Sequence, residues 1–149
     1  MKDSGNDTQR GFSFIELLVV FAVISLLTGF GLFGLSGFRT GYALQSARDE
    51  VILIFQSSRS LAVSTGAQIT VRIDAANRML WAEDANGNRK TNRVQLESGV
   101  QITGPSQIIF TGTGSVASGQ ISQYTFRAPR SSKILNLVLY PKTGRAEAG

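Results

Sequence analysis

The chain has 149 residues, of which 42% are hydrophobic and 17% charged, with 15 Lys and Arg, 10 Asp and Glu, no histidine and no cysteine. This length fits one domain of ordinary size. Without histidine and cysteine, the sequence excludes a disulfide framework, a thiolate nucleophile, a Cys/His zinc site and a Ser-His-Asp triad. Adjacent pairs such as Ser132-Lys133 and Glu83-Asp84 lack the geometry of a catalytic pair. We therefore predict that the protein is not an enzyme and holds no cofactor or metal.

Charged side chains are missing from one stretch near the N-terminus. Leu17 to Phe38 contains no ionisable residue. As a helix this stretch would span about 33 Å, enough for a hydrocarbon core of about 30 Å. No face of it is polar, unlike a surface helix. A secretory signal peptide and a buried core helix are the alternatives. Asp3 and Asp7 precede the stretch, which is also longer than the h-region of an ordinary signal peptide. A domain of this size rarely encloses a helix that is apolar on every side. A membrane span is the favoured interpretation.

The start of this segment carries a more specific pattern. The basic residue and glycine of Arg10-Gly11 are followed by the aromatic Phe12 and, four positions later, by Glu16. This run resembles the class III signal of type IV pilins and type II secretion pseudopilins. The resemblance implies that a prepilin peptidase cuts the chain between Gly11 and Phe12 and methylates the new amine of Phe12.

The same resemblance gives Glu16 a role. In filaments of this class the glutamate faces the N-terminal amine of a neighbouring subunit, which implies that Glu16 sets the register between subunits. A carboxylate and an ammonium group attract far more strongly in a low dielectric than in water, and either one alone in a packed bundle is costly. A carboxylate held at the lipid headgroups is the alternative.

Charged and polar residues occur again from Arg39 onward. From Leu44 to Ala62, apolar residues recur at three- and four-residue steps. This spacing predicts an amphipathic helix that ends near Thr65, with Gly66 as its C-terminal stop. We expect it to continue the apolar helix and to pack on a globular head.

After Gly66 apolar and polar residues alternate, which is typical of half-buried strands. Strands are predicted over residues 69–74, 78–83, 95–103, 107–110, 123–128 and 134–140, separated by Gly, Pro and Asn turn signals. No helical pattern lies between them, so the sheet should be mainly antiparallel.

The predicted fold is α+β: a long N-terminal helix, transmembrane in its first half and amphipathic in its second, packed on a small antiparallel β-rich head. The predicted segments are a leader (1–11), a transmembrane and filament-core helix (12–38), and the amphipathic helix with the head (39–149).

Several motifs in the head narrow the resemblance. They are the small residues from Ser57 to Ala62, an aromatic residue with a D-x-N-G-N turn from Trp81 to Asn88, I-x-F-x-G-x-G from Ile108 to Gly114, and a closing Gly144-Arg145. Together they resemble the GspH/FimT group of minor pseudopilins and minor pilins. The resemblance implies a minor subunit that acts near the tip of a filament.

The turn from Asp84 to Asn88 has two interpretations. As part of a calcium loop it has its glycine at the fourth position instead of the sixth, and Gln95 stands where an EF-hand has its bidentate glutamate. Asn-Gly is also a strong hairpin signal. We predict a hairpin turn and no metal.

The head is basic. From Arg39 onward there are 13 basic and 7 acidic side chains, a net charge of +6. The basic residues cluster at Arg89, Lys90 and Arg93, at Arg127, Arg130 and Lys133, and at Lys142 and Arg145. DNA-binding relatives of the FimT type carry G-R-x-R near the C-terminus, but here Glu147 takes the place of the second arginine. This departure disfavours a nucleic acid and favours a solvated face or acidic partner subunits.

The favoured functional prediction is a structural minor pseudopilin of a type II secretion system. Its partners would be other pseudopilins in a helical filament, the prepilin peptidase and, before assembly, the inner membrane. It would cross that membrane once, with the head in the periplasm. A minor pilin of a type IV pilus, with or without DNA uptake, and an unprocessed membrane-anchored adaptor are the alternatives.

Overall fold

A computed structural model of the chain describes residues 13–119, 121–129 and 131–149, with the backbone alone over residues 30–38. In this part of the chain one helix, α1 (Phe14–Thr65), precedes eight strands. The strands are β1 (Ile69–Asp74), β2 (Met79–Asp84), β3 (Val94–Gln95), β4 (Gln101–Thr103), β5 (Gln107–Phe110), β6 (Ser122–Arg127), β7 (Ile134–Tyr140) and β8 (Arg145–Ala148). The predicted α+β fold is confirmed.

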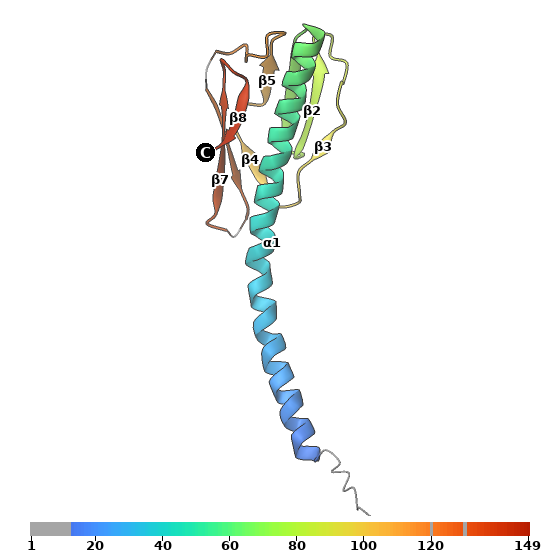
Figure 1. Ribbon diagram of the computed structural model, residues 1–149, viewed down its shortest axis with the longest axis vertical. Coiled ribbons are helices and arrows are strands. Elements are labelled where there is room, and N and C mark those ends of the chain that lie inside the picture. Colours follow the sequence, from blue (N-terminus) through green and yellow to red (C-terminus); the bar gives the residue numbers. More distant parts are fainter. Residues whose placement is uncertain (1–12, 120, 130) are drawn as a thin grey trace, which may run out of the picture. The chain divides into compact units, whose positions relative to one another are not determined.

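The chain divides into two compact units, one up to Phe38 and a head from Arg39 to Gly149. The head contains two four-stranded sheets (Figure 1). The first sheet has the order β3-β2-β1-β5 and the second has the order β4-β6-β7-β8. Every strand pair is antiparallel, as predicted.

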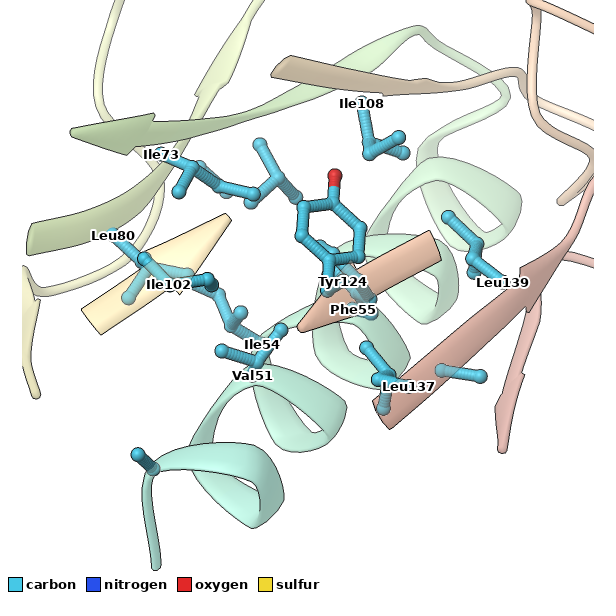
Figure 2. Close-up of a cluster of buried hydrophobic side chains, with 14 of the residues drawn as sticks. Val51, Ile54, Phe55, Ile73, Leu80, Ile102, Ile108, Tyr124, Leu137 and Leu139 are labelled. Carbon is cyan, nitrogen blue, oxygen red and sulfur yellow. The ribbon is translucent and has the colours of Figure 1, made fainter. Parts of the chain in front are cut away.

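Within the head, α1 packs on both sheets through one stripe of small and apolar residues. The buried members of this stripe are Leu44, Ala47, Val51, Ile54, Phe55, Ser58 and Ala62. Phe55 joins the helix to each sheet. Its ring centroid lies 6.1 Å from that of Phe110 in β5. It lies 5.5 Å from that of Tyr124 in β6 (Figure 2). The helix ends at Thr65, and Gly66 follows with a φ of +64°, so the predicted helix end is confirmed.

The predicted strand over residues 95–103 is wrong. The structure divides it into β3, in the first sheet, and β4, in the second. Between them the chain turns at Gly99, whose φ is +91°, and the N–H of Val100 donates to the carbonyl of Glu97 at 3.3 Å. Leu96, Val100 and Ile102 are all buried. They lie at alternate positions of the sequence, and this pattern predicts a single strand where the structure has two.

Strand β8 was not predicted. It pairs with β7 from Tyr140↔Arg145 to Leu137↔Ala148, and Ala146 faces the core with 8% of its surface exposed. Its sequence, Arg-Ala-Glu-Ala, contains none of the β-branched or aromatic residues that mark strands. Its pairing with β7 therefore overrides a weak local preference.

Candidate functional site

The first part of α1 exposes apolar side chains in every direction. Between Phe14 and Gly29 every side chain is exposed, including Phe14 (78%) and Leu27 (65%). Its few hydroxyl groups are satisfied within the helix: Ser25 Oγ donates to the Phe21 carbonyl at 2.8 Å and Thr28 Oγ1 to the Ile24 carbonyl at 2.7 Å. An exposed apolar surface of this extent marks an interaction site.

The predicted membrane span covers residues 12–38, and several of these lie outside the residues whose side chains are described. Among the described residues, no helical stretch is both long enough and apolar enough to count as a membrane span.

Glu16 lies in the first turn of α1. The carbonyl of Ser13 accepts the N–H of Glu16 at 3.0 Å and that of Leu17 at 3.2 Å, which places Ser13 at the start of the helix. Ser13 and Glu16 have the S-x-x-E spacing of a capping box, and a negative charge is favourable at the N-terminal end of a helix. Sequence reasoning missed this position of Glu16 in the first turn of the helix. Gly11 and Phe12, the predicted processing site, lie outside the described residues.

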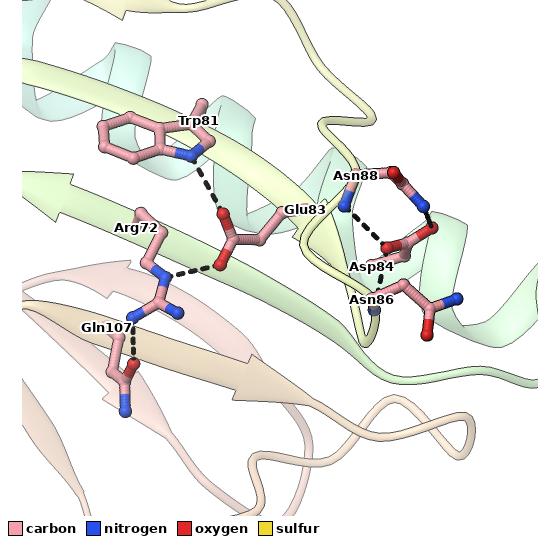
Figure 3. A network of polar contacts seen from close by, with 7 residues as sticks. All are labelled: Arg72, Trp81, Glu83, Asp84, Asn86, Asn88 and Gln107. Atoms are coloured by element: carbon pink, nitrogen blue, oxygen red, sulfur yellow. Dashed lines mark hydrogen bonds and ion pairs between the residues drawn. The ribbon is translucent and has the colours of Figure 1, made fainter.

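The Asp84–Asn88 segment forms the predicted hairpin turn (Figure 3). One carboxylate oxygen of Asp84 accepts the backbone N–H groups of Asn86 and Asn88, each at 2.9 Å. The other oxygen accepts the Asn88 side-chain amide at 3.2 Å and lies 3.1 Å from Lys90 Nζ. The hydrogen bond from the Asn88 backbone, helped by Lys90, lowers the pKa of Asp84 to about 2. The carboxylate is thus used to hold the turn.

A second polar network joins three strands on the outer face of the first sheet. Arg72 in β1 donates to Glu83 in β2 and to Gln107 in β5, both at 2.6 Å, and Trp81 Nε1 donates to Glu83 at 3.2 Å (Figure 3). The hydrogen bond from Arg72 lowers the pKa of Glu83.

The glycine motifs of the sequence meet near the end of α1. A Cβ on Gly112 would lie 2.5 Å from the Gly66 carbonyl oxygen, and a Cβ on Gly144 would overlap the carbonyl oxygen of Gly114. Arg59 Nε donates to that same Gly114 carbonyl at 3.2 Å. Two of the motifs that indicated the head type, Ile108–Gly114 and Gly144-Arg145, therefore contain sites where backbone segments of the head approach too closely for any side chain.

The comparisons with known proteins agree with this geometry. Residues 6–32 match the family model described as the prokaryotic N-terminal methylation motif. No curated protein sequence matches the chain. Among solved structures, the type IV minor pilin FimU of Pseudomonas aeruginosa has a TM-score of 0.63 and 18% identity, over 75% of this chain and 92% of FimU. Two structures of the minor pseudopilin EpsH from the type II secretion system of Vibrio cholerae have TM-scores of 0.52 and 0.58, at 16% and 13% identity. They cover 74% of this chain and 95% and 97% of EpsH.

The chain has a pilin-like fold. The methylation motif and the fold of the head both support the resemblance to the GspH/FimT group.

The basic clusters of this pilin-like chain are partly neutralised within the head. Lys90 pairs with Asp84, and the Arg93 guanidinium lies 5.5 Å from the centre of the Trp81 ring. Arg145 Nε lies 3.0 Å from Glu147, the residue in the place of the second arginine of G-R-x-R. Arg130 lies outside the described residues. The internal pairing of Arg145 leaves less positive charge for a phosphate backbone at this end of the head.

Proposed function

We propose that this chain is a minor pseudopilin of a type II secretion system. It is inserted in the inner membrane with its head in the periplasm, cut between Gly11 and Phe12, methylated at Phe12, and built into the pseudopilus near its tip. There it primes assembly with other minor subunits. The observation that carries the proposal is the exposed apolar surface of Phe14–Gly29, which lies within the residues that match the methylation motif and belongs to the helix that continues into the head.

The apolar helix suits both stages of this life cycle. Lipid chains and the helices of neighbouring subunits are both apolar surroundings, so the same side chains can be covered before and after extraction from the membrane. The charge on Glu16 would then find its partner in the methylated amine of the adjacent subunit, where a low dielectric strengthens the attraction. A subunit in the wrong register would leave both charges unpaired, at a cost of several kcal/mol.

A minor pilin of a type IV pilus is the second candidate, and the higher TM-score with FimU favours it. The salt bridge between Arg145 and Glu147 supports the secretion assignment over a pilus that takes up DNA, because it engages an arginine that would otherwise bind phosphate.

Deleting the gene in its own bacterium separates the candidates. We expect secreted enzymes to accumulate in the periplasm while surface pili and twitching motility persist. The wild-type gene should restore secretion, and Gly11→Trp should not, because it blocks cleavage. Lost pili with normal secretion would favour the type IV pilus. Full complementation by an uncut Gly11→Trp protein would favour an unprocessed membrane-anchored adaptor.

A further inference from the structure

A groove of about 350 Å³ lies on the head between α1 and the segment that leads into β3. Glu50, Leu53 and Ile54 line it from the helix, and Thr91, Asn92 and Val94 line it from the other side. The three helical residues are spaced i, i+3 and i+4, so they share one face of α1. Ile54 belongs to the core with 4% of its surface exposed, whereas Leu53 is 63% exposed at the groove. The groove thus combines an uncovered large apolar side chain with a carboxylate.

The carboxylate of Glu50 lacks a partner. Its Oε2 atom is shielded from solvent, and no described residue donates a hydrogen bond to it. Desolvation raises the pKa of Glu50, and repulsion from Glu97 raises it further. A buried acceptor without a donor costs free energy that a partner would recover.

The basic residues that lie near the groove residues in the sequence have other partners. The Arg48 guanidinium lies 3.3 Å from a carboxylate oxygen of Asp49, and Lys90 Nζ lies 3.1 Å from a carboxylate oxygen of Asp84. Arg93 stacks over Trp81. Nothing that the structure describes supplies the positive charge that Glu50 and Glu97 together require.

We propose that this groove receives a lysine or arginine side chain from a different subunit of the filament, with its charged end on Glu50 and its aliphatic stem against Leu53. Long basic side chains have this combination of an apolar stem and a cationic end, and charge-assisted hydrogen bonds to a carboxylate are strong. A neighbour without the basic residue would bury Glu50 unpaired, so the contact selects among possible neighbours. This inference rests on the proposed function, because it takes the neighbour from the filament.

Site-specific photo-crosslinking in cells that assemble the filament tests the proposal. A benzophenone amino acid replaces Ser57, which also lines the groove, in the full-length chain. The control carries it at Val63, a 51% exposed position on the same helix outside this groove. We expect Ser57 to yield a product with another subunit, attached within a few residues of a lysine or arginine. Glu50→Gln should reduce that product about tenfold, the loss expected for one charge-assisted hydrogen bond, and should leave any Val63 product unchanged.

Reversing both charges completes the test. Glu50→Lys should abolish the Ser57 product, and changing the identified basic residue of the neighbour to glutamate should restore it. A product at twice the mass of this chain, attachment to a neighbour without a nearby basic residue, or a product unaffected by Glu50→Gln would overturn the proposal. Recovery of the chain in the filament fraction is scored in the same cells. A chain that is absent from filaments refutes the proposed function, whereas a chain that is present without the product refutes only this contact.

The thermal stability of the purified full-length chain tests whether Glu50 has a purely structural role. Because the pKa of Glu50 is raised in the fold, ionisation at neutral pH opposes folding, and Glu50→Gln should raise the unfolding temperature while it weakens the contact. A variant with a lower unfolding temperature would show that Glu50 stabilises its own chain, which contradicts the proposal.

Discussion

The close approach of Gly144 to Gly114 provides a quantitative test of how the head is held together. Gly144 has a φ of +60°, and a Cβ there would overlap the Gly114 carbonyl oxygen and lie 3.1 Å from Arg59 Cδ. Gly144→Ala therefore incurs two costs. The left-handed backbone costs about 1–2 kcal/mol for a residue with a Cβ. Forcing the two backbone segments apart costs about 1–3 kcal/mol more. We expect a total loss of about 3 kcal/mol in the free energy of unfolding.

Gly66→Ala is the matched control. Gly66 has a nearly equal φ of +64°, but nothing lies within 4 Å of its added Cβ. It should lose only the backbone contribution, about 1–2 kcal/mol. The assay is urea unfolding followed by circular dichroism on a fragment of residues 39–149, with the difference between the two variants as the measured quantity. If Gly144→Ala loses no more stability than Gly66→Ala, the glycine motifs do not serve the contact assigned to them.

Three further predictions follow from the structure. A fragment that begins at Thr40 should be a soluble, folded and β-rich monomer, because the head has its own core; a predominantly helical circular dichroism spectrum would contradict this. Because the pKa values of Glu83 and Asp84 are lowered in the fold, their contributions to stability should be complete above their ordinary values of 4.5 and 3.8 and should be lost as the pH falls below them. For Asp84, this loss should extend to a pH of about 2. Urea unfolding at several pH values measures this. The free energy of unfolding of Asp84→Ala should be lower than that of the wild type at pH 6, and the two values should converge near pH 2. A difference that does not change with pH would refute the assignment. Glu16→Val should insert in the membrane normally but be depleted from isolated filaments, and normal incorporation would refute the register role of Glu16.

The parts of the fold that follow from a local pattern could be predicted from the sequence. The helix end at Thr65 was predictable because Gly66 ends a regular apolar stripe, and the turn at Asp84 because Asn-Gly accommodates the required backbone. The strands β5 and β7 coincide with their predicted ranges because their alternation is bounded by clear turn signals.

The remaining features depend on contacts between distant segments. Strand β8 forms because it pairs with the edge of β7. No residue of its sequence, Arg-Ala-Glu-Ala, indicates a strand by itself. The partition of residues 95–103 between two sheets depends on where each sheet has a free edge. Similarly, the sequence shows Glu50 as one acid on an amphipathic helix, and only the packing around it reveals a shielded oxygen without a donor.

The central claim is that the chain is processed as a pilin-like subunit. The most direct test is the intact mass and N-terminal sequence of the full-length protein, expressed with and without a prepilin peptidase. The account predicts that the chain loses residues 1–11 and gains one methyl group only when the peptidase is present. The product would have 138 of the 149 residues, with methylated Phe12 at its N-terminus. An uncut chain in the presence of an active peptidase would contradict the claim, and the register role of Glu16 would be refuted with it.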